Sequence, residues 1–171
     1  MWAFIAVAII LLLFFTVFFG APYVPAKMKD VKRAFEDLYE ISYDDTFLDL
    51  GSGDGRVLRE VSTRGGKAVG YELHPLLVAI SRWLSRGDKN VHVLQGNFWK
   101  MPFPYDTTTV YLFGDGRDIG KMTKLIESQA VRLGRPLNVL SYGFELPHHT
   151  PVKKSGAHLL YVIEPLQPRK A

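Results

Sequence analysis

The hydrophobic positions of the chain follow two patterns, one in its first 20 residues and another in the rest. Residues 1–20 contain no charged side chain, and Thr16 is their single polar side chain. About 20 helical residues, each rising roughly 1.5 Å, cross a hydrocarbon layer of about 30 Å. We therefore expect a transmembrane anchor over residues 1–20. A cleaved signal peptide and a buried core helix are weaker alternatives, because the segment has no early Lys or Arg and is apolar on every side.

The residues that follow this segment predict a hinge and an orientation. Pro22 and Pro25 prevent a helix from continuing, so residues 21–26 are expected to form a stiff, extended hinge. Basic residues lie just beyond Pro25, and none precedes the apolar segment, so the positive-inside rule places the rest of the chain in the cytoplasm. These basic residues are Lys27, Lys29, Lys32 and Arg33. The prediction is a single-pass membrane protein whose folded domain, residues 27–171, lies on the cytoplasmic face.

Beyond the hinge, strand-like and helix-like segments alternate. An amphipathic pattern over residues 27–41 predicts a first helix, and short apolar runs then alternate with further helical patterns. Such alternation is typical of a doubly wound α/β fold, a mostly parallel sheet with helices on both faces. The last strand follows a turn-rich stretch and is expected to be antiparallel. The expected strands are 45–50, 67–71, 91–94, 108–113, 137–142 and 158–163, and the later helices are 56–63, 75–86 and 118–132.

A glycine-rich loop follows the first of these strands and gives the strongest signal of a binding site. Glycines let the backbone turn tightly and approach a ligand without a Cβ in the way. The loop lies between a strand and a helix N-terminus, where free N–H groups favour a carboxylate or a phosphate, and at the edge of the sheet where ligands of such folds bind. The predicted site residues here are Asp49, Gly51, Ser52, Gly53 and Gly55.

The spacing of this loop favours S-adenosylmethionine over a dinucleotide. A dinucleotide fingerprint, G-x-G-x-x-G, needs glycine at position 56, where the chain has Arg56. Asp49 would repel a pyrophosphate but suits the amino group of S-adenosylmethionine. Glu72, at the end of the second strand, is placed to accept hydrogen bonds from both ribose hydroxyls. We predict S-adenosylmethionine as the cofactor; a nicotinamide or flavin cofactor, and a strand–turn–helix that binds nothing, are the alternatives.

The adenine end of the cofactor has candidate residues after the second and third strands. Asn97 stands where enzymes of this kind often have an Asp that accepts a hydrogen bond from the adenine amino group, and its amide oxygen can do the same. Phe98 or the neighbouring Trp99 can pack on the adenine face, and Leu73 beside Glu72 completes the predicted cofactor site. The alternative is that Asn97 only shapes a turn between core aromatic residues.

Together these segments resemble one family, the membrane-anchored protein-lysine methyltransferases of the mitochondrial adenine nucleotide translocase and of the ATP synthase c-subunit, which has prokaryotic relatives. The resemblance covers roughly residues 21–164. It implies a Rossmann-like class I methyltransferase fold and transfer of a methyl group from S-adenosylmethionine to a lysine of a membrane or membrane-associated protein, in a prokaryote at the inner membrane. The matching segments are 22–25, 49–56, 69–75, 81–82, 96–100 and Ser141, Phe144, Pro147 and Pro151.

Catalytic candidates lie on loops at the carboxyl edge of the predicted sheet. Methyl transfer mainly needs the amine and the methyl group held together and water kept out, so no obligatory catalytic motif is expected. Tyr23 in the hinge is the first candidate, with an interfacial tyrosine that anchors a helix end as the alternative. The other candidates are Asp115, His148, Tyr142 and Glu145. The pair His148-His149 has no third ligand at a usable spacing, so no metal site is predicted.

Composition narrows the function without choosing the substrate. The net charge is +4 and the chain has no cysteine, and no long basic run is interleaved with aromatic residues, so we do not expect a nucleic-acid partner. The expected partners are a lipid bilayer and a protein lysine. Two other functions remain open: methylation of a lipid, quinone or other small molecule in the membrane, and cofactor binding without catalysis.

Overall fold

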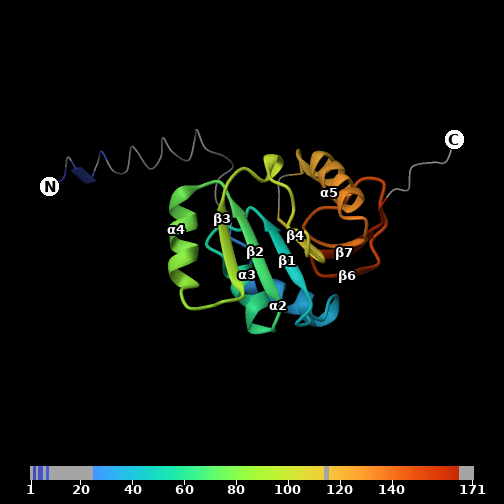
Figure 1. Cartoon of the computed structure of the whole chain (residues 1–171), viewed down its shortest axis with the longest axis horizontal. Coiled ribbons are helices and arrows are strands. Elements are labelled where there is room, and N and C mark those ends of the chain that lie inside the picture. The colour runs from blue at the N-terminus through green and yellow to red at the C-terminus, as the bar shows by residue number, and fades with distance from the viewer. Residues whose placement is uncertain (1, 3, 6, 8–24, 114–115, 166–171) are drawn as a thin grey trace.

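A seven-stranded sheet organises the part of the chain described by the computed structural model, residues 2, 4, 5, 7, 25–113 and 116–165 (Figure 1). Its strands lie in the order β3-β2-β1-β4-β5-β7-β6. The first five are parallel, β7 is antiparallel to β5, and β6 is antiparallel to β7. The strands are β1 (Thr46–Leu50), β2 (Lys67–Glu72), β3 (Val91–Gln95), β4 (Thr109–Leu112), β5 (Leu137–Tyr142), β6 (Lys153–Ser155) and β7 (His158–Ile163).

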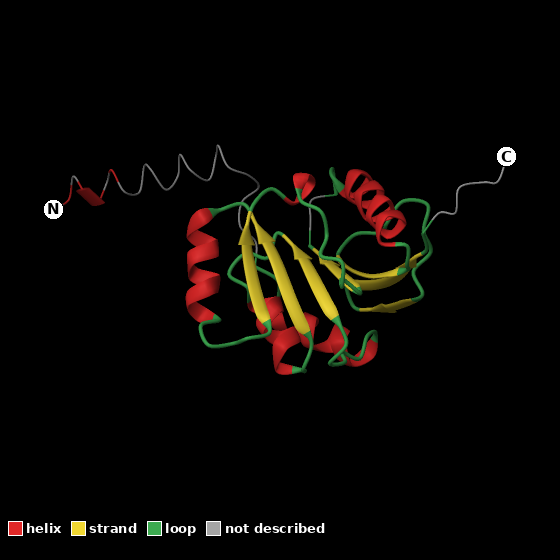
Figure 2. Cartoon of the chain, viewed as in Figure 1, coloured by secondary structure: helices red, strands yellow, loops and turns green. Residues whose placement is uncertain are grey.

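Helices cover both faces of the sheet, which gives two separate hydrophobic cores (Figure 2). One core contains buried residues of α2 (Met28–Asp37), α3 (Arg56–Thr63) and α4 (Pro75–Leu84). The other contains buried residues of α5 (Ile119–Leu133), with the single 3-10 turn η1 (Phe98–Lys100) packed against it. Every residue of β1 is buried, as expected for a central parallel strand that is covered on both faces.

The boundaries of the elements follow local sequence rules. Pro75 opens α4, where its missing N–H costs nothing and its fixed φ suits a helix. Gly134 ends α5 in the left-handed conformation, with φ of 67°, which glycine adopts without strain. Arg82 of α4 donates two hydrogen bonds to the Val93 carbonyl, at 2.8 and 3.0 Å, and so fixes that helix against β3.

The predicted doubly wound α/β fold is confirmed, including the antiparallel last strand. Two elements were not predicted. The strand β6 has three residues, all polar, in a stretch that the sequence marked as turn-rich, and it forms because β7 offers an edge to pair with. The turn η1 is too short to give a periodic pattern, and the Asn97 side chain caps it by accepting a hydrogen bond from the Trp99 N–H at 3.0 Å.

The prediction of a transmembrane helix over residues 1–20 is wrong on this structure, and so is that of a single-pass membrane protein with its domain on the cytoplasmic face. Among the described residues, no helix has the length and apolar character to cross a bilayer. The longest, α5, has 15 residues, which rise roughly 22 Å and include charged side chains, whereas a hydrocarbon core is about 30 Å thick. Residues 8–20 of the predicted segment and most of the predicted hinge lie outside the described residues.

Candidate functional site

The glycine loop after β1 is held against β2 by backbone hydrogen bonds. The N–H groups of Gly51 and Ser52 both donate to the Tyr71 carbonyl, at 2.8 and 3.1 Å. Gly51 has φ of +88°, and a Cβ built there meets no atom within 4 Å. The loop therefore turns sharply and leaves open space in front of Gly51, where a ligand can approach the backbone.

Two close packings bring the loop, β2 and α4 together. A Cβ on Gly70 of β2 would overlap the Ser52 hydroxyl and come within 2.6 Å of Leu58 Cδ1. A Cβ on Gly55 would overlap the Ser81 hydroxyl of α4. The Ser52 side chain is thus buried between loop and strand, which makes it a packing residue of the predicted site rather than one that faces open space.

Glu72, at the end of β2, holds the loop in place. Its side-chain oxygens accept hydrogen bonds from the Gly53 N–H and the His74 N–H, both at 2.8 Å. A carboxylate offers about four lone-pair positions, so two backbone donors leave room for two more. Glu72 is 9% exposed. The structure therefore brings Glu72 and Gly53, two of the predicted cofactor residues, into contact, with acceptor capacity left on Glu72 for a pair of hydroxyl groups.

Asp49 is a buried carboxyl group at the end of β1. Its pKa is raised to about 8, first because burial disfavours the charged form and then because Glu72 and Asp54 add negative charge nearby. No hydrogen bond from a described residue contributes to that shift. A cationic ligand would neutralise this group, so the site fits a molecule that carries an ammonium or a sulfonium.

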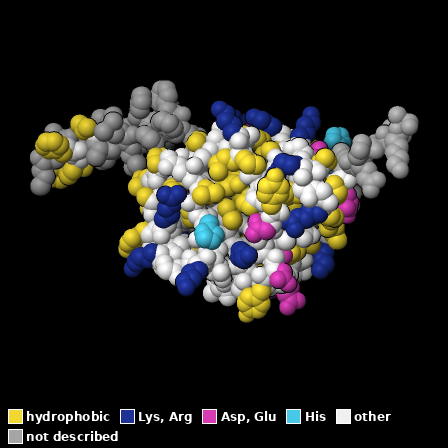
Figure 3. Space-filling view, in the orientation of Figure 1, with side chains coloured by type: hydrophobic (Ala, Val, Ile, Leu, Met, Phe, Trp, Pro, Cys, Tyr) yellow, Lys and Arg dark blue, Asp and Glu magenta, His cyan; other side chains and the backbone are white. Residues whose placement is uncertain are grey.

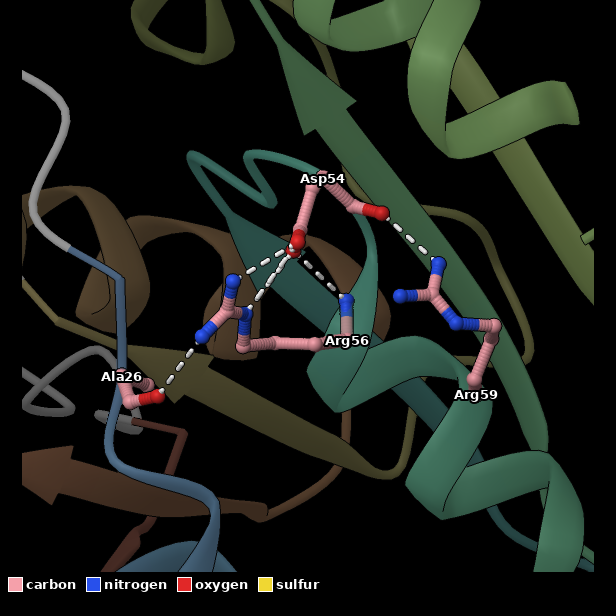
Figure 4. A network of polar contacts seen from close by, with 4 residues as sticks. All are labelled: Ala26, Asp54, Arg56 and Arg59. Carbon is pink, nitrogen blue, oxygen red and sulfur yellow. Dashed lines mark hydrogen bonds and ion pairs between the residues drawn. The ribbon is translucent and has the colours of Figure 1, made fainter. Parts of the chain in front are cut away.

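A charged network links the loop to Ala26, the last residue of the predicted hinge (Figure 4). Asp54 accepts hydrogen bonds from the Arg56 guanidinium, at 2.8 and 3.0 Å. Burial acts to raise the pKa of Asp54, but the hydrogen bonds from Arg56 and the charges of Arg56 and Arg59 outweigh it, so the pKa is lowered. Arg56 also donates to the Ala26 carbonyl at 3.4 Å, and Arg59 donates to the Asp54 carbonyl at 2.7 Å. The glycine loop is therefore tied to the segment that enters α2.

The residues predicted to hold adenine lie around the ends of β2 and β3. Leu73 is 43% exposed, and the Phe98 ring lies 4.6 Å from that of Trp99. Lys121 stands 4.2 Å above the Trp99 ring, a cation–π distance. Figure 3 shows hydrophobic side chains gathered in the upper middle of the face turned to the viewer, with Lys and Arg side chains along the edge above them. Asn97 uses its side-chain oxygen to cap η1, and its NH2 group stays available as a donor.

A stack of aromatic rings lies at the carboxyl ends of β4 and β5. The Tyr142 ring lies 4.2 Å from His158, nearly parallel to it, and 4.7 Å from Phe113. The Tyr142 hydroxyl donates to the Asp30 carboxylate of α2 at 2.7 Å. His158 is fully buried, and a hydrogen bond of 3.0 Å joins its Nε2 to the Tyr111 hydroxyl.

The pKa values of this stack keep its rings uncharged. Burial lowers the pKa of His158 to about 4 although Asp30 acts against it, so the imidazole is neutral near pH 7. Burial, with the hydrogen bond and the charge of Asp30, raises the pKa of Tyr142 to about 12. The pKa of Tyr111 is raised further, by burial and by Asp49, Tyr142 and Asp30. Asp30 is thus a carboxylate set against neutral rings.

Of the predicted catalytic residues Tyr23, Asp115 and His148, the structure describes one, His148. Tyr23 and Asp115 lie outside the described residues and stay predictions. His148 is exposed in the turn after β5 and has φ of 64°, unusual for a residue other than glycine. Its neighbour His149 pairs with Glu127 of α5 at 2.8 Å. In the described ranges, no group of three His, Cys, Asp or Glu side chains is placed to bind a metal ion.

Sequence reasoning did not find Asp30 or His158, and it named Tyr142 only as one of several candidates. Asp30 is 112 residues from Tyr142 along the chain, so spacing carries no signal of their contact. A weak signal existed for Asp30, because it is the acidic residue in the first turn of α2, in a stretch otherwise rich in basic residues.

Comparison with known proteins places this site within a family. The sequence profile of the ANTKMT methyltransferase domain matches residues 49–153. Over 138 residues the chain is 30% identical to the ATP synthase c-subunit lysine N-methyltransferase of Homo sapiens, an alignment that covers 79% of this chain and 57% of that protein. The chain therefore spans less than two thirds of the length of this relative. It is also 29% identical over 140 residues to a protein-lysine N-methyltransferase of Saccharolobus islandicus, which covers 76% of this chain and 81% of that protein.

A solved structure shares the whole fold. The RNA methyltransferase of Salinibacter ruber, crystallised in complex with S-adenosyl-L-homocysteine, superposes with a TM-score of 0.75 at 26% identity. The match covers 86% of this chain and 98% of that chain. The strand order and this similarity confirm the predicted Rossmann-like class I methyltransferase fold.

Proposed function

We propose, since the chain belongs to the family of the ANTKMT methyltransferase domain, that it is an S-adenosylmethionine-dependent protein-lysine N-methyltransferase. Relatives from a human and from an archaeon both carry lysine methylation in their names, and the archaeal alignment covers most of both chains. The acceptor is proposed to be a lysine side chain of a protein, with the c-subunit of ATP synthase as the first acceptor to test, because the human relative is named for it.

The cofactor is proposed to bind along the glycine loop. Asp49 faces the amino group of its methionine part, and the open backbone at Gly51 lies against the same part. Glu72 receives the two ribose hydroxyls on the lone pairs that Gly53 and His74 leave free. Leu73, Asn97 and Phe98 are proposed to surround the adenine, as an apolar edge, a polar edge and a ring face.

The single observation that carries the cofactor assignment is the buried acid pair Asp49 and Glu72. Burial first, and then the negative charges of Glu72 and Asp54, raise the pKa of Asp49 to about 8, so ionising Asp49 has a cost that a cationic ligand removes and an anionic dinucleotide increases. When bound, S-adenosylmethionine supplies a methyl group on a positively charged sulfur. In the transfer a C–N bond forms, a C–S bond breaks and one proton leaves the nitrogen, so the chain has to orient the amine and exclude water.

The experiment is a transfer assay with labelled S-adenosylmethionine and extract from cells that lack the gene. After the reaction the extract is separated into protein, RNA and lipid, and the protein is hydrolysed to amino acids. The proposal predicts label in Nε-methylated lysine. A second candidate, RNA methylation, is favoured by the similarity to the Salinibacter ruber enzyme and predicts label in RNA. Label in lipid alone would identify a small-molecule methyltransferase.

A matched pair of variants shows whether the label depends on the site. Glu72→Ala should abolish labelling of lysine, because it removes the proposed ribose acceptor. Glu40→Gln changes an exposed carboxylate outside the loop and should label as the natural protein does. Binding of S-adenosylhomocysteine without transfer to any fraction would contradict the proposed catalysis and leave a cofactor-binding protein.

A further inference from the structure

The order of the strands fixes the side from which the acceptor must approach, given the proposed function. The adenine, ribose and methionine parts of the cofactor are proposed to follow β3, β2 and β1 in turn. These are successive neighbours in the sheet, and β4 and then β5 lie beyond β1. A ligand laid out in this direction points its reactive end towards β4 and β5. The side chains at the carboxyl ends of those two strands are Phe113 and Tyr142.

Of the rings stacked at the carboxyl ends of β4 and β5, Phe113 is the one with surface that an incoming side chain can contact. Tyr142 is 7% exposed, with the His158 ring nearly parallel to it and the Phe113 ring also close by. Phe113 is half-buried. An apolar ring in this position can cover the aliphatic part of a lysine side chain and keep water from its nitrogen, and aromatic rings also attract ammonium groups.

The Tyr142 hydroxyl is oriented by its partners. It donates its proton to Asp30 at 2.7 Å, and the Lys27 backbone lies close enough to lower the Tyr142 pKa through a hydrogen bond. A phenol oxygen accepts as well as donates hydrogen bonds, so an amine N–H can approach the same oxygen as the Lys27 N–H. A hydroxyl that donates to a carboxylate is also a better acceptor, because hydrogen bonds in a chain polarise one another.

The charges that face the stack suit an amine. Asp30 approaches from α2, and Asp49 acts on Tyr111 from β1. His158 is neutral, so it adds no positive charge that would repel a lysine. Asp30 therefore offers a carboxylate that attracts an ammonium and, through Tyr142, gives its nitrogen a fixed direction, whereas Asp49, with a pKa of about 8, is mostly protonated near pH 7 until a cation lies beside it.

We propose that Tyr142, oriented by Asp30, is the acceptor-positioning residue of this enzyme, and that Phe113 forms the apolar wall of the same lysine site. The Tyr142 oxygen accepts one N–H of the incoming amine and thereby points the nitrogen lone pair at the methyl group. Asp30 does not contact the amine in this proposal; it holds the Tyr142 hydroxyl, which does.

The test uses the full-length chain, labelled S-adenosylmethionine and the same gene-deleted extract as acceptor, at varied protein concentration. Tyr142→Phe keeps the ring and removes only the hydroxyl, so the fold should persist. We expect the maximal rate of lysine labelling to fall by tenfold or more, while the Kd for S-adenosylhomocysteine stays within twofold. Tyr105→Phe, at a tyrosine that is 81% exposed, is the matched control and should behave as the natural protein.

The Asp30 variants separate orientation from structure. Asp30→Asn keeps an acceptor for the Tyr142 hydroxyl and should lose less activity than Asp30→Ala. The double variant of Tyr142→Phe and Asp30→Ala should be no slower than the slower single variant, because both changes remove one shared hydrogen bond. Phe113→Leu should raise the acceptor concentration needed for half-maximal rate more than it lowers the maximal rate.

The two proposals fail in different ways. If the natural protein labels no lysine, the proposed function is contradicted and the acceptor site falls with it. If the natural protein labels lysine and Tyr142→Phe does so at the same rate, only the acceptor site is overturned. A loss of S-adenosylhomocysteine binding in Tyr142→Phe would also overturn it, since the hydroxyl would then serve the cofactor.

Discussion

The glycine loop after β1 and the ring stack after β4 and β5 are held by different kinds of contact. At β1–β3, the loop is held by partners close along the chain: Gly53 bonds to Glu72 19 residues away, and His74 to the same carboxylate two residues away. In the ring stack after β4 and β5, the two hydrogen bonds described above join residues farther apart in sequence, 47 residues for Tyr111 and His158 and 112 for Asp30 and Tyr142. The proposed cofactor half, which is the glycine loop with β1–β3, rests on short-range contacts and can be recognised as a motif. The proposed acceptor half, which is the ring stack with β4–β7, rests on long-range contacts that form only in the folded chain.

The same difference separates what each half offers to a ligand. The cofactor half presents backbone N–H groups, a glycine in open space and two buried carboxyl groups, which suit a fixed cationic molecule. The acceptor half presents neutral rings and one hydroxyl held by a carboxylate, which suit a flexible amine. Changes in the first half should alter cofactor affinity, and changes in the second should alter turnover.

The largest effect is expected at Glu72. Glu72→Ala removes two charge-assisted hydrogen bonds to the ribose, each worth about 1.5–3 kcal/mol, so the affinity for S-adenosylhomocysteine should fall by about 100-fold or more. Glu72→Gln keeps one acceptor oxygen, so its affinity for S-adenosylhomocysteine should lie between those of the natural protein and Glu72→Ala. Calorimetry measures both, with Glu40→Gln as control. If Glu72→Ala bound S-adenosylhomocysteine as tightly as the natural protein does, the proposed ribose contact at Glu72 would be wrong. The proposed direction of the cofactor along the sheet would then be wrong as well.

The next effect concerns packing of the loop on β2. Gly70→Ala places a methyl group on Ser52 and Leu58, and such overpacking costs about 1–3 kcal/mol of unfolding free energy. The midpoint of thermal unfolding should fall by roughly 2–4 °C for each kcal/mol in a chain of this size. Gly120→Ala is the matched control, because a Cβ there meets nothing within 4 Å and alanine favours a helix. Equal midpoints for the two variants would show that loop and strand do not pack as described.

A smaller effect depends on pH and on Asp49. Its pKa in the folded protein, about 8, lies above its ordinary value of 3.8, so the folded state binds the proton more tightly than the unfolded state. The stability from this group is fully present below pH of about 4 and is lost as the pH rises through about 8. Without ligand, the unfolding midpoint of Asp49→Asn should therefore rise relative to that of the natural protein as the pH goes from 5 to 9. The expected change in this difference is about 3 °C or more.

Removing the Asp49 charge is expected to have the opposite effect on cofactor binding. Asp49→Asn should bind S-adenosylhomocysteine more weakly, because the ammonium loses its partner. Binding to the natural protein at pH 7 should also release protons, which calorimetry in buffers of different ionisation enthalpy detects. A stability difference that does not change with pH, together with no proton release, would mean that Asp49 is already ionised in the free protein.

The smallest effect is expected at Asn97. Asn97→Asp keeps an oxygen for the Trp99 N–H and for the adenine amino group, so affinity for S-adenosylhomocysteine should stay within about threefold. Asn97→Ala loses the cap of η1, worth about 1 kcal/mol, and should bind about fivefold more weakly. Equal affinity in all three proteins would leave Asn97 as a turn residue only.

Sequence patterns predicted the fold and the cofactor half because both depend on nearby residues. Alternating apolar segments predicted the strands, and the loop from Asp49 to Arg56 with Glu72 predicted the proposed cofactor site, in which Gly53 and Glu72 are in contact. The patterns failed for β6, whose three residues pair only because β7 is present, and for Asp30, whose contact with Tyr142 forms only once α2 has packed against the sheet. Hydropathy also predicted a membrane span that the described helices do not contain.

The most direct test of this division is a crystal structure of the chain with S-adenosylhomocysteine bound. The account predicts the ribose hydroxyls on Glu72, the amino group facing Asp49, and the sulfur directed towards β4 and β5. The sulfur should lie within about 8 Å of the Tyr142 hydroxyl, the reach of a methyl group and an amine in near-attack contact. A sulfur that points away from Phe113 and Tyr142, or a ribose away from Glu72, would contradict the account.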